Sequence, residues 1–226
     1  MEEKQTKTDK ETQILIVDDH PIVRQGLTLL INQEKGMNVC SEAENADMAM
    51  NEITKSNPDI LIIDISLKGV DGIELTKNIR AFYPDLPILI LSMHDETLFA
   101  ERALRAGASG YLMKQEGTEE VVNAIKKVMK GQIYLSEEMI EALLQKFIHG
   151  NIITENNPIQ QLSDRELSIF ELIGHGYGTK EIAEKLHLSG KTVETYRGKI
   201  KKKLNLKNSI ELIQHASQWI ENENIS

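Results

Sequence analysis

The stretch ILIVDDHPIVRQGL, residues 14–27, places four consecutive branched apolar residues directly before two aspartates. A run of this kind is typical of a strand that is buried on both faces of a parallel sheet. Two carboxylates at the end of a buried strand repel each other unless an opposite charge lies nearby. The stretch therefore predicts a strand over residues 14–17 and raises the question of what Asp18 and Asp19 do.

Apolar runs of the same kind recur at residues 59–64, 87–92 and 109–113, with a weaker run at 37–41. The segments between them carry apolar residues at helical spacing. Alternating strands and helices predict parallel pairing through right-handed crossovers. The first half of the chain is therefore predicted to be a doubly wound α/β domain with a five-stranded parallel sheet.

Length and composition set limits on the class of protein. A chain of 226 residues favours two domains, and no apolar run approaches the roughly 18 residues of a membrane span. Residues 1–12 are polar and lack the apolar segment of a signal peptide, so we expect a disordered tail and a cytoplasmic protein that does not contact a membrane. Cys40 is the only cysteine, which excludes an internal disulfide and a cysteine metal cluster.

Polar residues follow four of the predicted strands. Asp18 and Asp19 follow the first, Asp64 the third, Ser92 ends the fourth and Lys114 comes just after the fifth. In doubly wound sheets the ligand site lies outside the carboxyl ends of the strands, so these side chains should converge. The alternative is that the acidic residues are only helix caps or turn formers.

Three crowded carboxylates need a cation, and a set of oxygen ligands suits Mg²⁺. With the metal bound, one carboxylate can attack a phosphoryl group, while a hydroxyl and an ammonium stabilise the oxygens of that group. In this interpretation Asp18 and Asp19 hold the metal and Asp64 accepts the phosphoryl group. Ser92 then bonds a phosphoryl oxygen, and Lys114 pairs with its charge.

The second half of the chain shows helix starts and stops. Ser136 is expected to cap a helix that ends at Gly150, and residues 150–161 look like a flexible joint. After the joint, Ser163 and Glu166 form a capping-box pattern that opens another helix.

Three further helices are expected after that one. Thr179 is expected to cap a short helix, and the turn HLSG leads into a third helix at 191–206. A final helix over 209–220 offers Ile210 and Ile213, with Trp219, for packing. The second half is thus predicted to be an all-α domain that contains a helix-turn-helix.

The helix expected at residues 191–206 has one apolar face and one basic face. Val193, Ile200 and Leu204 lie on one stripe, whereas residues 191–207 contain seven basic residues and one acidic residue, a net charge of +6. The whole chain carries −9, so the basic charge is concentrated here. Such a helix suits the major groove of double-stranded DNA, although lysine-rich helices are also common as plain solvated surfaces.

Residues 13 to about 131 resemble the receiver domain of two-component response regulators, which has a flavodoxin-like fold. The resemblance rests on VDDHPIVRQGL, PDILIIDISLKGVDGIEL, PILILSMHDE and ALRAGASGYLMK. It implies that the backbone carbonyl of Ser66 is a further metal ligand, that Tyr111 is a switch aromatic, and that Gly72 opens the helix after the acceptor. Gln115 replaces the proline of many relatives, which puts a cis peptide there in doubt. His94 is expected to face solvent.

Residues 160–220 resemble the four-helix LuxR-type DNA-binding domain of the NarL/FixJ group. The resemblance rests on LSDRE and on GHGYGTKEIAEKLHLSGKTVETYRGKIKKKLNL. By position it implies base-facing sites at Glu194, Thr195 and Gly198. The residues that it places mainly on phosphates are Lys191, Thr192, Tyr196, Arg197, Lys199 and Lys202.

Together the two resemblances imply a transcriptional regulator rather than an enzyme. The expected organisation is a tail (1–12), a receiver domain (13–131), a helical linker (132–161) and a DNA-binding domain (162–226). A sensor histidine kinase would phosphorylate Asp64, and the phosphorylated chain would form a homodimer on DNA.

Three alternatives to this interpretation stay open. One is a Mg²⁺-dependent phosphohydrolase, although such enzymes usually have an acid where position 66 is serine. The second is a DNA-binding regulator that is never phosphorylated. The third is RNA binding, which the shortage of stacking aromatics beyond Tyr196 disfavours.

Overall fold

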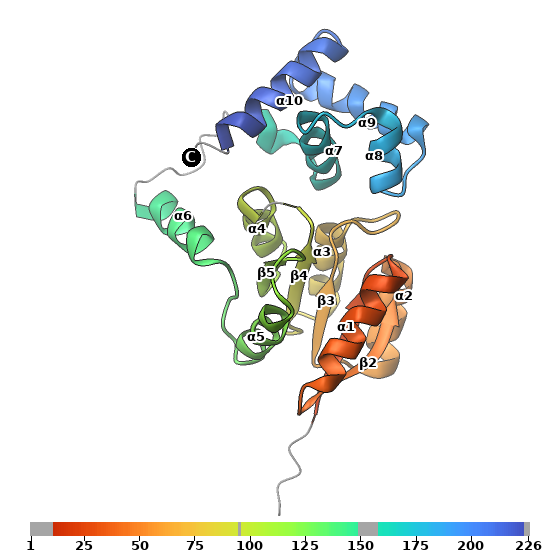
Figure 1. Ribbon diagram of the computed structural model, residues 1–226, viewed down its shortest axis with the longest axis vertical. Helices are drawn as coiled ribbons and strands as arrows, with labels where there is room; N and C mark the ends of the chain where they lie inside the picture. The colour runs from red at the N-terminus through yellow and green to blue at the C-terminus, as the bar shows by residue number, and fades with distance from the viewer. Residues whose placement is uncertain (1–10, 95, 149–157, 224–226) are drawn as a thin grey trace, which may run out of the picture. The chain divides into compact units, whose positions relative to one another are not determined.

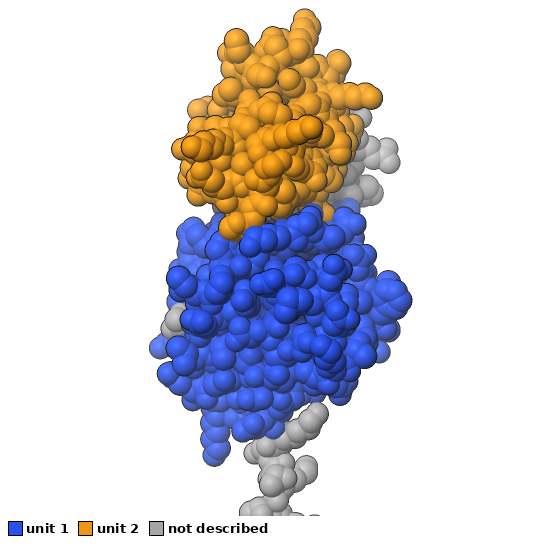
Figure 2. All heavy atoms as spheres, turned by 90° about the vertical axis from the view of Figure 1, so that its right-hand side faces the viewer, with its two compact units in different colours: residues 1–96, 103–135 blue, residues 97–102, 136–226 orange. Residues whose placement is uncertain are grey.

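The computed structural model describes residues 11–94, 96–148 and 158–223 (Figure 1). The chain divides into two compact units, residues 1–96 with 103–135 and residues 97–102 with 136–226, coloured separately in Figure 2. The expected helix stop at Gly150, most of the expected joint and residues 1–10 of the expected tail lie outside the described residues.

A five-stranded, fully parallel sheet forms the centre of the first unit, with the strand order β2-β1-β3-β4-β5. The predicted α/β class and number of strands are therefore confirmed. Thr12 already pairs with Met37, so this residue belongs to the sheet rather than to the expected tail. The strands are β1 (Thr12–Val17), β2 (Met37–Ala43), β3 (Ile60–Ile63), β4 (Ile88–Ser92) and β5 (Gly110–Met113).

Helices connect successive strands, as the alternating pattern predicts (Figure 1). The side chains of Asn45 and Asp71 cap α2 and α3 by accepting hydrogen bonds from the backbone N–H groups of Met48 and Glu74. The helices are α1 (Pro21–Gln33), α2 (Ala46–Ser56), α3 (Gly72–Phe82), α4 (Glu96–Arg105) and α5 (Thr118–Met129).

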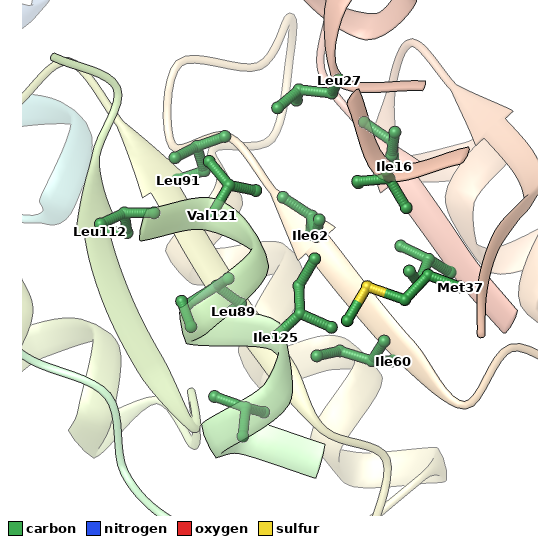
Figure 3. Close-up of a cluster of buried hydrophobic side chains, with 14 of the residues drawn as sticks. Ile16, Leu27, Met37, Ile60, Ile62, Leu89, Leu91, Leu112, Val121 and Ile125 are labelled. Atoms are coloured by element: carbon green, nitrogen blue, oxygen red, sulfur yellow. The ribbon is translucent and has the colours of Figure 1, made fainter. Parts of the chain in front are cut away.

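The sheet is buried on both faces, which explains the continuous apolar strands. Ile14 and Ile16 lie in a cluster with buried residues of α1 and α5 (Figure 3). Leu15 and Val17 alternate with them and are also fully buried, so they occupy the opposite face. The core therefore fixes the register of β1, and with it the position of the aspartates that follow.

The second unit is helical in the part that the structure describes. Ser136 accepts a hydrogen bond from the N–H of Met139, as expected for the cap of α6 (Glu137–Ile148). Within the described ranges no helix has the length and apolar character needed to cross a bilayer. The remaining elements are the 3₁₀ turn η1 (Pro158–Gln161), α7 (Asp164–Gly174), α8 (Thr179–Lys185), α9 (Gly190–Lys203) and α10 (Ser209–Glu223).

The starts of α7 and α8 differ in how well the sequence predicts them. Ser163 and Glu166 form the expected capping box of α7. For α8 the expected cap is wrong: the N-cap is Gly178, and Thr179 is the first helical residue. The Glu181 carboxylate accepts from the N–H of Gly178, which replaces a side-chain cap at that end.

The sequence predicts the buried residues of α9 better than those of α10. The expected stripe is buried: Val193 and Ile200 lie in α9, and Leu204 caps its C-terminus. In α10 the buried residues are Leu212 and Ala216, whereas the expected packing residues Ile210 and Ile213 are 68% and 45% exposed. Trp219 packs on Phe170 of α7, with ring centroids 5.3 Å apart.

Candidate functional site

The sheet brings the predicted site residues together at the carboxyl ends of its strands. The N–H of Asp18 donates to the carbonyl of Ala43, and the N–H of Asp64 donates to the carbonyl of Val17. Next to the edge strand β5, the N–H of Lys114 donates to the carbonyl of Ser92. Each residue thus continues the hydrogen bonding of a strand pair, so the sheet itself fixes the relative positions of the side chains.

Lys114 joins two of the carboxylates. Its Nζ lies 2.6 Å from Oδ2 of Asp18 and 2.9 Å from Oδ2 of Asp64. Both carboxylates are almost completely buried, and the lysine side chain is 11% exposed. Removing one partner of such a bridge is strongly destabilising, because it leaves a buried charge without its counter-charge.

Burial and charge oppose each other in this cluster. Burial raises the pKa of Asp64 above its ordinary value, which the nearby Asp18 reinforces and the ammonium of Lys114 opposes. Burial alone would lower the pKa of Lys114, but the carboxylates of Asp64 and Asp18 raise it above its ordinary value. The Lys114 side chain therefore stays positively charged. The negative charge of Asp64 is only partly offset by this ammonium, because burial still disfavours the ionised carboxylate.

The carboxylates have the composition of a site for a hard cation. Asp18, Asp19, His20 and Asp64 each offer one ligand atom, and these atoms all lie within 4.8 Å of one another. Oδ1 of Asp64 is buried and accepts no hydrogen bond within the described residues. A buried oxygen of this kind is costly unless a cation or a donor reaches it, so the cluster fits a divalent ion.

His20 borders this cluster. Its Nδ1 lies 2.8 Å from Oδ1 of Asp19 and 3.3 Å from Oδ1 of Asp18. Its backbone N–H also donates to Oδ1 of Asp18 at 2.8 Å. The sequence pattern does not predict His20 as a site residue.

Gly72 lies directly against the backbone of Asp64. A Cβ atom at this position would lie 2.1 Å from the carbonyl oxygen of Asp64 and 2.8 Å from its carbonyl carbon. The N–H of Gly72 donates to the carbonyl of Ile65. Only glycine lets α3 begin this close to Asp64, which gives a physical reason for the glycine that the receiver resemblance singles out.

His94 connects Ser92 with Tyr111, the predicted switch aromatic. Its N–H donates to Oγ of Ser92 at 3.0 Å, and its carbonyl accepts from the hydroxyl of Tyr111 at 2.8 Å. Its ring Nε2 lies 3.1 Å from Oγ of Ser66. His94 is only 7% exposed, so the expectation that it faces solvent is wrong. The ring bonds Ser66 instead.

Arg24 of α1 is a second site residue that the sequence pattern does not predict. Its Nη1 donates to the backbone carbonyl of Asp18 at 2.5 Å, and its Nε pairs with Oε2 of Glu42 at 3.2 Å. Oε1 of Glu42 accepts in turn from Thr28. Arg24 therefore connects the loop that carries the acidic pair to α1 and to the end of β2.

The peptide after Lys114 is trans, because the described chain contains no cis peptide bond.

α9 presents most of the predicted DNA contacts on its surface. Ser189 caps this helix by accepting from the N–H of Thr192, and Nζ of Lys199 lies 5.2 Å from the ring centroid of Tyr196. Thr192, Tyr196 and Arg197 are partly buried. The exposed members are Lys191, Glu194, Thr195, Gly198, Lys199 and Lys202.

Two protein-family models match this chain. The response regulator receiver domain matches residues 14–126, and the luxR family of bacterial regulatory proteins matches residues 160–216. The chain is 39% identical over 207 residues to the oxygen regulatory protein NreC of Staphylococcus carnosus, a match that covers 90% of this chain and 95% of NreC.

Solved structures give the same result. RcsB from Salmonella enterica serovar Typhimurium, bound to the rprA promoter in the presence of the phosphomimetic BeF3-, is 29% identical with a TM-score of 0.59, covering 92% of this chain and 99% of that one. A LuxR-family response regulator from Aurantimonas sp. is 37% identical over 62% of this chain and 99% of that one, with a TM-score of 0.58. This chain belongs to the two-component response regulators that combine a receiver domain with a LuxR-type DNA-binding domain, a family of transcription factors rather than enzymes.

Proposed function

We propose that Asp64 accepts the phosphoryl group and that its phosphorylation controls how tightly α9 binds double-stranded DNA. The observation that carries the proposal is the bridge from Lys114 to both Asp18 and Asp64 at one edge of the sheet. We place the receiver domain at residues 13–131, the linker at 132–161 and the DNA-binding domain at 162–226.

In the transfer, an oxygen of Asp64 forms a bond to phosphorus as the bond between phosphorus and the donor breaks. We expect the donor to be the phosphohistidine of a sensor kinase, whose imidazole is the leaving group. Lys114, 2.9 Å from Asp64, stays close enough to pair with the added negative charge. The hydroxyl of Ser92 turns from His94 to donate to a phosphoryl oxygen.

Asp18, Asp19, Asp64 and the backbone carbonyl of Ser66 would hold Mg²⁺ at this edge. When bound, the ion supplies positive charge that neutralises the oxygens of the phosphoryl group. The buried Oδ1 of Asp64, which has no hydrogen-bond partner within the described residues, supports this assignment. His20 hydrogen-bonds the carboxylate of Asp18 and lies 2.8 Å from that of Asp19, so it helps to orient the acidic pair.

His94 explains how the event at Asp64 reaches the rest of the receiver. Because its backbone bonds both Ser92 and Tyr111, a Ser92 hydroxyl that leaves for the phosphoryl group releases one end of this connection. An equilibrium moved from 1:99 to 99:1 requires about 5.5 kcal/mol of differential stabilisation. We assign this stabilisation to the phosphoryl dianion, which gains contacts with a metal, Lys114 and Ser92.

On DNA, the exposed lysines of α9 would neutralise phosphates while the helix enters the major groove. We expect the phosphorylated chain to act as a homodimer, because two linked helices can read two half-sites about one helical turn apart. The promoter complex of RcsB, solved with a phosphomimetic, supports DNA binding by the phosphorylated state by analogy.

Labelling with acetyl phosphate and Mg²⁺ tests the acceptor. Wild type should be labelled and Asp64→Asn should not. Asp59→Asn is the matched control, because Asp59 precedes β3, where its carboxylate accepts from the N–H of Gln13. Equal labelling of Asp64→Asn would show that the acceptor lies elsewhere. A wild type that no donor labels would favour the regulator that works without phosphorylation.

A further inference from the structure

Three side chains of the helix-turn-helix form one hydrogen-bonded group, which we call the Thr179–Glu194–Arg197 clamp. The hydroxyl of Thr179, at the start of α8, donates to Oε1 of Glu194 at 2.6 Å. Nη1 of Arg197 donates to the same hydroxyl at 3.0 Å, and Nε of Arg197 lies 3.7 Å from Oε1 of Glu194. The clamp thus joins α9 to α8.

The two charged members differ in exposure. The Arg197 side chain is only 11% exposed, whereas that of Glu194 is 57% exposed. An arginine that is mostly buried and held by Thr179 is poorly placed to reach a phosphate, although its position in the family pattern suggests that role. The Glu194 side chain is therefore accessible on the same helix as the lysines of α9.

We propose that Glu194 is a specificity-determining residue that reads the amino group of a cytosine in the major groove, and that Arg197 is a positioning residue that holds Glu194 rather than a phosphate contact. The inference rests on the proposed function, because it names which residue gives α9 its sequence preference. It goes beyond that function by assigning the base.

The choice of cytosine follows from hydrogen-bonding chemistry. A carboxylate only accepts hydrogen bonds, and the donors on base edges in the major groove are the amino groups of cytosine and adenine. Adenine places its N7 acceptor beside its amino group, so a carboxylate there meets a lone pair. Cytosine has no such acceptor, which makes it the favoured partner of Glu194.

The surroundings of Glu194 prepare it for this contact. Thr179 and Arg197 contact Oε1, which leaves Oε2 to accept from a base. A side chain that is already held loses less freedom on binding than a mobile one. One turn further along α9, a Cβ at Gly198 would meet no atom within 4 Å, so packing within the chain does not require glycine there. Its small size leaves room for a base edge beside Glu194.

Selection of duplexes from a random library by the full chain, phosphorylated with acetyl phosphate and Mg²⁺, tests the base assignment. Wild type should select a motif with one C·G pair that it prefers by roughly ten- to a hundredfold. Glu194→Gln should lose this preference and shift toward A·T, because glutamine both donates and accepts as adenine requires. Glu184→Gln on the exposed side of α8 is the charge-matched control and should select the wild-type motif.

The salt dependence of binding tests Arg197 separately. Lys199→Gln should lower the slope of log K against log salt by about one, as expected for a lost phosphate contact. Arg197→Gln should keep the wild-type slope but relax the preference at the pair that Glu194 reads. Thr179→Val, which removes the hydroxyl without changing side-chain shape, should have the same effect as Arg197→Gln.

Two results would overturn the inference while leaving the proposed function intact. One is a Glu194→Gln chain that selects the wild-type motif, and the other is an Arg197→Gln chain whose slope falls as much as that of Lys199→Gln. A wild type that binds no duplex in either phosphorylation state would overturn the proposed function and this inference together. Circular dichroism of each variant checks that the helices are intact, and Thr179→Val tests the clamp without changing a charge.

Discussion

Replacing Gly72 by alanine should disturb the acceptor aspartate directly. The added Cβ would lie 2.1 Å from the carbonyl oxygen of Asp64, whereas real Cβ atoms keep at least 3.0 Å from such neighbours. The start of α3 and the backbone of Asp64 must therefore separate by about 0.9 Å. Because a misplacement of about 1 Å can cost on the order of 100-fold in rate, we expect phosphorylation to slow by about that factor.

The same overlap should lower the free energy of unfolding by about 1–3 kcal/mol, as overpacking usually does. The assay measures the rate of labelling by acetyl phosphate with Mg²⁺, together with urea unfolding. Gly26→Ala is the matched control, because a Cβ at Gly26 in α1 meets no atom within 4 Å. It should label at the wild-type rate and gain roughly 0.5–1 kcal/mol in stability. A Gly72→Ala chain that labels and unfolds like wild type would refute the reasoning.

Three further outcomes are expected. Mg²⁺ at 100 times its Kd should stabilise wild type by about 2.7 kcal/mol, and Asp19→Asn should lose most of this gain in a thermal melt. Burial raises the pKa of Glu166, but Lys203, 2.6 Å away, and the backbone of Ser163 lower it below 4.5 overall. The stability from this pair is therefore present above pH 4.5 and lost as the pH falls through the lowered pKa, so Glu166→Gln should flatten that part of the unfolding profile. Ile62→Ala in the core should cost about 2–5 kcal/mol in urea unfolding, whereas Ile22→Ala, 84% exposed, should stay within about 0.5 kcal/mol.

The sequence predicts the site residues that a parallel sheet positions by itself. Asp18, Asp64 and Lys114 follow buried strands, and all strands of the sheet run in the same direction. Their convergence depends only on strand order, so the apolar runs in the sequence are enough to predict it. Gly72 is also found from the sequence, but only through resemblance. Its physical reason, the contact with the Asp64 backbone, needs coordinates.

The residues that support the site from outside the strands are not predictable in this way. His94 lies in a loop, and its ring bonds Ser66, 28 residues earlier in the chain. Arg24 reaches a backbone carbonyl and a glutamate of β2, which no local pattern signals. The clamp has the same character, since Thr179 belongs to a different helix from the pair it contacts. Such contacts depend on how helices and loops pack.

The most direct test of the central claim is the affinity of one DNA duplex for the chain before and after phosphorylation. Fluorescence anisotropy with a duplex obtained by selection gives Kd for wild type and for Asp64→Asn, each with and without acetyl phosphate and Mg²⁺. We predict that phosphorylation tightens binding by wild type and leaves Asp64→Asn unchanged. Equal affinities of wild type in the two states, or the same gain in Asp64→Asn, would contradict the account.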